Sequence, residues 1–149
     1  YILIYLQGRQ PTIVHRDIKP SNILLGEKKI HLVDFGSVKT LINKPDATSV
    51  FTTINTHDYT PPEQYMGRAL TASDLYSLGL TMVSIVTRKH PSQLPRKGNR
   101  IDLEQLIEFS PAFIDWLQWM TEVSLERRLQ SAMEALQALD AAKVRDATA

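Results

Sequence analysis

The sequence predicts a mainly α-helical α+β fold with one small β-hairpin, within a single domain. Apolar residues recur at helical spacing through much of the second half of the chain. In the first half, short apolar runs at 13–14, 23–25 and 30–33 favour strands. The length of 149 residues is typical of one domain, and a chain of that size can bury about two thirds of its unfolded surface.

The chain opens with a short expected helix and continues into a polar loop. Residues 1–7 are apolar enough for the buried end of a helix, and Gly8 is its expected stop. The loop that follows carries five polar side chains within eight positions: His15, Arg16, Asp17, Lys19 and Asn22. The apolar runs on either side would hold this loop rigidly. A turn at 26–29 leads into the run that delivers Asp34, so the hairpin would bring two acids, a lysine and an amide close together.

These residue types suit the transfer of a phosphoryl group. Asp17 has no apolar role and could accept a proton from a hydroxyl, and Lys19 could stabilise charge on a transferring phosphoryl group. Asn22 and Asp34 carry oxygen donors suited to Mg²⁺, which often takes one or two protein ligands plus substrate phosphates. Either motif alone has a simpler interpretation. Residues 15–22 could be a charged surface loop, and Asp-Phe-Gly could be an ordinary turn. The two motifs together, in this order and at this spacing, favour the chemical interpretation.

Five motifs resemble those of the protein kinase family, and together they cover nearly the whole chain. Residues 15–22, His-Arg-Asp-Ile-Lys-Pro-Ser-Asn, resemble the catalytic loop, and residues 34–36, Asp-Phe-Gly, resemble the magnesium-binding turn. Residues 61–63, Pro-Pro-Glu, are similar to the motif that closes the activation segment. Residues 74–79 are similar to the start of the central helix of the C-terminal lobe, and Arg128 falls where the family has the arginine that pairs with that glutamate. The sequence Pro-Glu-Gln at 62–64 looks most like bacterial members of the eukaryotic-type Ser/Thr kinases.

The resemblance implies a role for each matching residue. Asp17 would orient and deprotonate the substrate hydroxyl, and Lys19 would stabilise the moving phosphoryl group. Asn22 and Asp34 would hold Mg²⁺, so that Lys19 and Asp34 also belong to the nucleotide site. Structural or regulatory roles are implied for His15, Arg16, Phe35, Gly36, Glu63, Asp74 and Arg128, and a position under the adenine for Leu24. Among these, His15 and Phe35 would stack in a hydrophobic spine.

Residues 37–60 form a long segment with little periodicity and many hydroxyl groups, typical of a functional or flexible loop. The resemblance implies that this is the activation segment, ordered when Arg16 helps to bind a phosphate on it. The candidate phosphosites are Thr52 first, then Thr53, Ser49 and Thr48. Thr56 falls where the family has a threonine that bonds the catalytic acid and lysine. Together with Lys19, it implies that serine or threonine, and not tyrosine, accepts the phosphoryl group.

Residues 71–87 are predicted to form a buried helix, because they are apolar nearly all round. Thr71 and Asp74 have capping-box-like spacing at its start. A buried carboxylate at Asp74 would be costly without hydrogen bonds. The resemblance implies that backbone N–H groups of the catalytic loop supply them. A simple cap on its own helix is the alternative, and both contacts can hold.

The last third of the chain is expected to be a loop followed by helices. Residues 88–101 are predicted to be a loop with a basic run, and residues 102–108 a short helix. Ser110 followed by proline is typical of a helix start, and Ser131 to Glu134 of a capping box. The expected apolar positions are Phe113, Ile114, Trp116, Leu117 and Met120, and then Met133, Leu136 and Leu139. Trp116 and Trp119 are expected in core or interface packing, and residues 143–149 are expected to fray.

Composition excludes several classes of function. The formal net charge is +1, so no strong field points to a nucleic-acid partner or to an anionic membrane. The apolar run at 78–86 is too short to span a bilayer, and no signal peptide is visible. The chain contains no cysteine, which excludes disulfides and thiolate metal sites. This composition fits the reducing cytoplasm, where we expect the protein to act.

The sequence contains only part of a kinase nucleotide site, because it has no Gly-rich loop and no Val-Ala-Ile-Lys strand. We expect residues 1–149 to be a partial protein kinase domain, the C-terminal lobe, with an N-terminal β lobe as its missing partner. The enzyme would transfer the γ-phosphoryl group of ATP, with Mg²⁺, to Ser/Thr hydroxyls of a protein substrate. The isolated chain is expected to bind Mg-ATP weakly or not at all, which calorimetry can test.

An inactive, truncated kinase-like lobe that acts as a binding or scaffold module is the second interpretation. Asn55 and Asp58 stand where the family usually has glycine, and this departure favours the scaffold. The enzyme is favoured by four intact residues: Asp17, Lys19, Asn22 and Asp34. A lobe under no catalytic constraint has no physical need for all four.

Overall fold

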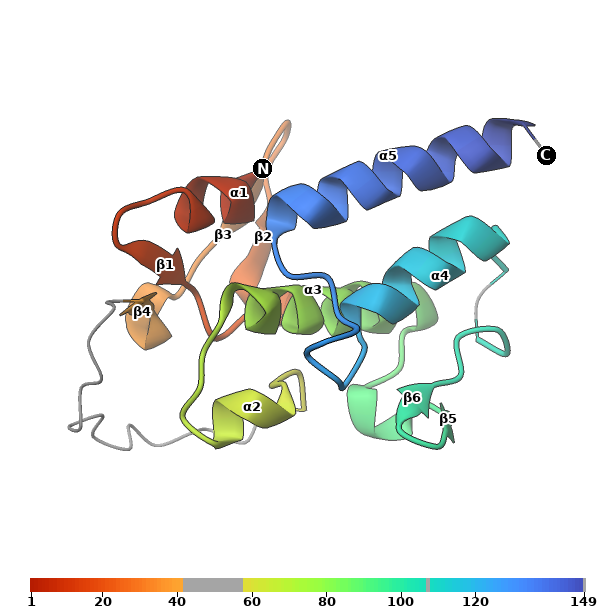
Figure 1. Cartoon of the computed structure of the whole chain (residues 1–149), viewed down its shortest axis with the longest axis horizontal. Coiled ribbons are helices and arrows are strands. Elements are labelled where there is room, and N and C mark those ends of the chain that lie inside the picture. The colour runs from red at the N-terminus through yellow and green to blue at the C-terminus, as the bar shows by residue number, and fades with distance from the viewer. Residues whose placement is uncertain (42–57, 107, 149) are drawn as a thin grey trace.

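The computed structural model describes residues 1–41, 58–106 and 108–148. Within these residues helices dominate, and the strands form three two-stranded antiparallel sheets (Figure 1). This architecture confirms the mainly α-helical α+β class. Outside the described residues lie Asn55, Thr56 and the candidate phosphosites Thr48, Ser49, Thr52 and Thr53.

The elements follow one another in an order that places most strands before the long helices. The α-helices are α1 (Ile2–Gln7), α2 (Pro62–Tyr65), α3 (Thr71–Thr87), α4 (Pro111–Met120) and α5 (Ala132–Thr148). The strands are β1 (Thr12–Val14), β2 (Ile23–Leu25), β3 (Ile30–Leu32), β4 (Lys39–Leu41), β5 (Arg96–Lys97) and β6 (Arg100–Ile101). Short 3-10 helices are η1 (Pro20–Asn22), η2 (Phe35–Ser37) and η3 (Pro91–Gln93). No helix among the described residues is long and apolar enough to cross a membrane.

Helix α3 runs through the middle of the fold and packs against β1, η1, α4 and α5 (Figure 1). Its bounds match the prediction, and its side chains Leu75, Leu80 and Val83 are at most 1% exposed. Helices α4 and α5 lie side by side next to it. Because α3 is buried along most of its length, the segments around it can be held in fixed positions.

The predicted β-hairpin is confirmed. Strands β2 and β3 pair in an antiparallel register with Ile23 opposite Leu32. The hairpin closes where the Gly26 N–H donates to the Lys29 carbonyl at 2.8 Å. It places the end of the polar loop and the Asp-Phe-Gly turn at the same end of one small sheet.

Strand β4 corrects the prediction that residues 37–60 lack regular structure. It pairs with β1, so that Thr12 lies opposite Leu41 and Val14 opposite Lys39. Three residues are too short a run to show a strand period in the sequence. The strand forms because β1, fixed by the helices beside it, offers a hydrogen-bonding edge.

Two predictions for the segment after α3 are wrong. The loop predicted at 88–101 contains the β5–β6 hairpin, in which Arg96 pairs with Ile101. Residues 102–108 do not form a helix in the part of this range that the structure describes. That part makes a turn, in which the Leu106 N–H donates to the carbonyl of the fully buried Leu103. A helix of this length would be marginally stable on its own. A turn that buries Leu103 forms there instead.

Helix α4 begins as predicted. The Ser110 hydroxyl accepts the Phe113 N–H at 3.3 Å, with proline at the first helical turn. Trp116 is 4% exposed and its Nε1–H donates to the Ala135 carbonyl at 2.7 Å, which fixes α4 against α5. Trp119 is 42% exposed, so only Trp116 is confirmed as a core residue.

Helix α5 begins with half of the predicted capping box. The Ser131 hydroxyl accepts the Glu134 N–H at 3.1 Å, whereas the Glu134 carboxylate accepts the N–H of Gln130 instead of that of Ser131.

The apolar stripe predicted for α5 is partly wrong. Leu139 packs against the core as predicted, but Met133 is 48% exposed, and the most deeply buried positions are small: Ala132, Ala135 and Ala142. Alanines allow the backbones of α4 and α5 to approach closely, which shifts the buried face of α5 by one position. The helix continues to Thr148, and residues 143–148 are exposed. The expected fraying of this end stays a prediction.

The close approach of α3 to the end of α4 generates a test of the fold. A Cβ atom at Gly79 would lie 2.8 Å from Thr121 Cγ2 and 3.0 Å from Met120 Cβ. We expect Gly79→Ala to lower the free energy of unfolding by about 1–3 kcal/mol in urea titrations, because overpacking forces the helices apart. Thr121→Ser removes the Cγ2 atom and should recover part of the loss in the double variant. Equal losses with and without Thr121→Ser would contradict this packing.

Candidate functional site

The polar loop at 15–22 brings three side chains together. The Lys19 ammonium lies 2.9 Å from Asp17 Oδ2, and the Asn22 amide donates to the same oxygen at 3.0 Å. The Asn22 amide also donates to the Asp17 carbonyl at 2.8 Å. The side chains of Asp17 and Lys19 are only 13% and 19% exposed. An acid, a cation and an amide therefore share one partly buried position.

Local chain geometry explains why Asn22 reaches back to Asp17. Pro20 begins the 3-10 turn η1, in which the Asn22 N–H donates to the Lys19 carbonyl at 3.0 Å. The Asn22 carbonyl accepts the Val33 N–H at 2.9 Å, which links the loop to the end of the hairpin. Because its backbone N–H and carbonyl are both hydrogen-bonded, Asn22 keeps its side-chain amide within reach of Asp17.

Asp34 lies on the turn that follows β3. Its backbone is left-handed, with φ of 62°, a region that Asp tolerates better than most residues. Its Oδ1 accepts the Gly36 N–H at 3.3 Å, and the residue is exposed. The next residue, Phe35, places its ring edge-on to the His15 ring, with the centroids 4.8 Å apart. This ring contact joins the turn to the polar loop.

His15 is fully buried, and its hydrogen bonds assign its tautomer. Its Nδ1 accepts the Asp17 N–H at 3.3 Å, so Nε2 carries the proton and donates to the Val33 carbonyl at 3.2 Å. Burial away from water lowers the pKa of His15, although the Val33 carbonyl and the nearby acids oppose this effect. A neutral ring therefore fits its surroundings, and it links the loop to the hairpin.

Asp74, at the start of α3, fastens the polar loop to the central helix. Its two carboxylate oxygens accept the N–H groups of His15 at 2.8 Å and Arg16 at 2.9 Å. These hydrogen bonds confirm the contact that the resemblance implies. The side chain is 1% exposed, and burial raises the pKa of Asp74 to about 6, against the lowering effect of the two N–H groups and of Arg16.

The capping box suggested by the spacing of Thr71 and Asp74 is wrong, because helix α3 is capped at Leu70 and Thr71 already lies within it. The Thr71 hydroxyl donates to the Gln130 carbonyl at 2.7 Å, and the Ser73 hydroxyl accepts the Leu70 N–H at 3.1 Å. The reason is tertiary: the Asp74 carboxylate accepts two N–H groups of the polar loop instead of capping its own helix.

A buried ion pair joins α2 to the turn before α5. Arg128 donates to Glu63 through two nitrogens, at 2.6 and 3.2 Å, and the two side chains are 0% and 4% exposed. The guanidinium also donates to the carbonyls of Glu122, Val123 and Ala72. All of its polar groups therefore have partners, as a buried charge requires. The pairing that the resemblance implies for Glu63 and Arg128 is present.

The sequence alone predicted no role for two residues of this region, Ser73 and Gln64. The Ser73 hydroxyl donates to Glu63 Oε1 at 2.8 Å and so helps to hold the ion pair. The Gln64 amide donates to the Arg16 carbonyl at 2.7 Å. Gln64 is part of the Pro-Glu-Gln sequence that resembles bacterial kinases, but the resemblance gave it no role.

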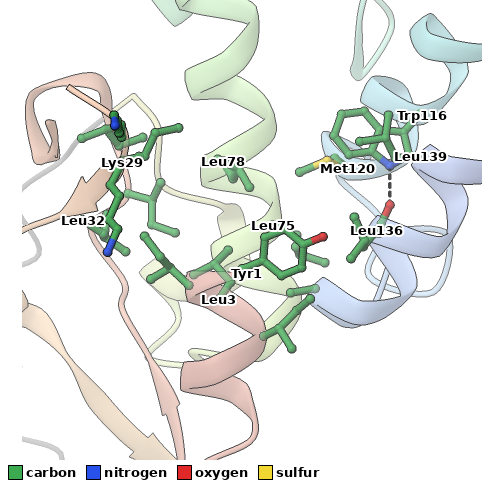
Figure 2. A pocket seen from close by; sticks show the side chains of 18 residues that line it. Tyr1, Leu3, Lys29, Leu32, Leu75, Leu78, Trp116, Met120, Leu136 and Leu139 are labelled. Carbon is green, nitrogen blue, oxygen red and sulfur yellow. Dashed lines mark hydrogen bonds between the residues drawn. The ribbon is translucent and has the colours of Figure 1, made fainter. Parts of the chain in front are cut away.

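An apolar cavity of about 640 Å³ lies beside this polar chemistry and is lined in part by Ile18, which stands between Asp17 and Lys19 (Figure 2). It is bounded by α1, the β2–β3 hairpin, α3, α4 and α5, with Lys28 and Lys29 on the hairpin turn as its charged residues. None of the lining residues is Asp17, Lys19, Asn22 or Asp34. Leu24 is 51% exposed and does not line this cavity either.

Comparison with known proteins gives one consistent result. The family model described as the protein kinase domain matches residues 3–139. Serine/threonine-protein kinase PknA of Nostoc sp. is 36% identical over 147 residues, which cover 93% of this chain and 26% of the relative. Serine/threonine-protein kinases B and C of Synechocystis sp. are 32% and 37% identical, over 93% and 87% of this chain and 26% of each relative. The chain spans about a quarter of the length of these curated relatives.

The buried ion pair predicts a large loss of stability on substitution. Glu63→Gln leaves the Arg128 guanidinium buried without its counter-charge, so the free energy of unfolding should fall by about 3–5 kcal/mol. Lys143→Ala breaks the exposed pair with Asp140 and should change it by about 1 kcal/mol at most. Urea titrations of both variants check this. Similar small effects at the two sites would show that the Glu63 pair does not hold α2.

Asp74 predicts a pH dependence of stability. Because the folded protein binds this proton more tightly than the unfolded chain, the contribution of Asp74 is greatest below its unfolded pKa and declines as the pH rises to about 6. The free energy of unfolding, relative to that of Asp74→Asn, should fall by at most about 1.4 kcal/mol per pH unit between about pH 4 and pH 6. Urea titrations across this range measure it. A relative stability that rises with pH there would contradict the assignment.

Proposed function

Since the chain belongs to the protein kinase family, we propose that it carries the phosphoryl-transfer residues of a serine/threonine protein kinase. Such an enzyme moves the γ-phosphoryl group of ATP to a serine or threonine hydroxyl of a protein substrate. The observation that carries the proposal is the cluster in which Asp17 contacts both Lys19 and Asn22. The names of the relatives support the choice of serine and threonine.

Asp17 is the residue that meets the substrate hydroxyl in this proposal. Its contacts with Lys19 and Asn22 both reach Oδ2, and its N–H and carbonyl are bonded as well. The carboxylate is therefore held in one orientation before the substrate arrives. In phosphoryl transfer the protein acts chiefly through such positioning, and Asp17 would orient the hydroxyl and accept its proton.

Lys19 supplies the positive charge beside the reacting group. Its ammonium lies 2.9 Å from Asp17 Oδ2, so it stays next to the carboxylate that would receive the proton of the hydroxyl. Charge spreads over the phosphoryl oxygens in the transition state, and a fixed cation in a partly buried site stabilises it.

Leu24, whose apolar side chain is half exposed after the loop, would lie under the adenine.

Asn22 and Asp34 fit a magnesium ion. Both amide hydrogen bonds of Asn22 come from Nδ2, which leaves its Oδ1 as the atom able to bind a cation. Asp34 presents an exposed carboxylate on the neighbouring turn. The described residues contain no cluster of three or more His, Cys, Asp or Glu side chains. Two oxygen donors match Mg²⁺, which takes its other ligands from water and substrate phosphates and would neutralise phosphate charge here.

Regulation would act through the segment at 37–60. Arg16 precedes Asp17, is partly buried, and would bind a phosphate added to Thr52 or, failing that, to Thr53, Ser49 or Thr48. Thr56 would bond the catalytic acid and lysine. Glu63 and Arg128 would then anchor the end of this segment to the helices below.

The decisive experiment is phosphoryl transfer from labelled ATP to a generic protein substrate. In the protein as its gene encodes it, Asp17→Asn should lower kcat by about 10²–10⁴-fold, because the carboxylate no longer accepts the proton. Asp115→Asn changes an exposed aspartate of α4 and serves as the matched control. No transfer by the unsubstituted protein would favour the scaffold interpretation. Equal rates for the unsubstituted protein and Asp17→Asn would remove Asp17 from the mechanism.

A further inference from the structure

We propose that Gln64 is a positioning residue that aligns Asp17 by holding the peptide unit between Arg16 and Asp17. This inference rests on the proposed kinase function. Gln64 lies in α2 and is 5% exposed. Its Nε2 donates to the Arg16 carbonyl at 2.7 Å, a contact that spans 48 residues of sequence.

The backbone at Arg16 needs support because it is left-handed, with φ of 72°. A long side chain at positive φ is uncommon and costs about 1–3 kcal/mol, so the surroundings must hold it. Asp74 holds the N–H of Arg16, and Gln64 holds its carbonyl. The following N–H, that of Asp17, donates to the ring of His15.

The peptide unit between Arg16 and Asp17 is thus hydrogen-bonded at both ends. Its carbonyl accepts the Gln64 amide, and its N–H donates to the His15 ring. The direction of this unit sets the direction in which the Asp17 side chain leaves the backbone. Because geometry decides most of the rate in phosphoryl transfer, a small rotation of the unit is expected to lower the rate.

The burial of Gln64 is hard to explain by stability alone. Its Oε1 is buried and has no hydrogen-bond partner among the described residues. A buried polar atom without a partner costs about as much as one ordinary hydrogen bond contributes. An apolar side chain of the same length would remove this cost but would also leave the Arg16 carbonyl without its donor, so the two effects on folding oppose each other. The amide therefore adds more to orientation than its own bond adds to stability.

Gln64 also links the polar loop to a firmly anchored element. The residue before it, Glu63, is paired with Arg128 and accepts the Ser73 hydroxyl, so α2 is fixed to the helices. Helix α2 follows directly after the segment that ends at residue 60. The alignment of Asp17 therefore depends on the docking of α2, through a single amide.

The test compares Gln64→Met with Gln137→Met in the protein as its gene encodes it. Met has nearly the length of Gln but cannot donate a hydrogen bond, and Gln137 is an exposed residue of α5. We expect Gln64→Met to lower kcat about 10- to 100-fold while KM for ATP stays within about twofold. The midpoint of thermal unfolding should move by less than about 4 °C. Gln137→Met should change none of these quantities.

Hydrogen exchange at the Asp17 amide gives a second readout that needs no activity. The Gln64→Met variant should exchange faster there, and the Gln137→Met variant should not. Unchanged exchange together with unchanged kcat would overturn the inference. So would a loss of thermal stability that accounts for the loss of kcat, since Gln64 would then be merely structural. If the unsubstituted protein transfers no phosphoryl group, the proposed function fails, and the exchange measurement still decides whether Gln64 holds this peptide unit.

Discussion

The polar loop depends on one buried carboxylate. Asp74 accepts two consecutive backbone N–H groups, of His15 and Arg16, and it stands at the start of the most deeply buried helix. Burying an acid so completely is unfavourable by itself, and the raised pKa of Asp74 reports that cost. The cost is offset because the carboxylate accepts the N–H groups of His15 and Arg16, and the left-handed backbone at Arg16 needs such support. The Asp17, Lys19 and Asn22 cluster follows directly on the backbone that this carboxylate holds.

A second buried charge fixes the other side of the site. The pair of Glu63 and Arg128 ties α2 to the segment between α4 and α5, and Ser73 of α3 completes it. Replacing such a pair by apolar residues is often neutral or stabilising, so its value lies in fixing one arrangement. Here the arrangement fixes α2, and α2 presents Gln64 to the loop. The two buried acids, Asp74 and Glu63, thus position the loop from two directions.

Local signals in the sequence predict much of this structure. The β2–β3 hairpin, the bounds of α3 and the serine-proline start of α4 follow from apolar period and capping chemistry, and all three are confirmed. Strand β4 could not be predicted because it pairs with β1, which is distant in sequence, and the turn at 103–106 could not because it depends on burying Leu103 in the core. The buried face of α5 differs by one position, since small alanines and not Met133 pack there. At the site, motif resemblance predicted roles for Asp17, Lys19, Asn22 and Asp34, and the structure brings the first three into contact. Gln64 was missed because its partner lies 48 residues away.

We propose that Asp74 aligns the loop that would transfer the phosphoryl group. Its most direct test is the single-turnover rate of phosphoryl transfer from ATP by the gene-encoded protein carrying Asp74→Asn, with helix content followed by circular dichroism. An amide can accept one of the two N–H groups but presents its own N–H to the other. The predicted result is a rate lower by about 100-fold with the helical signal retained. A rate equal to that of the unsubstituted protein would contradict the account.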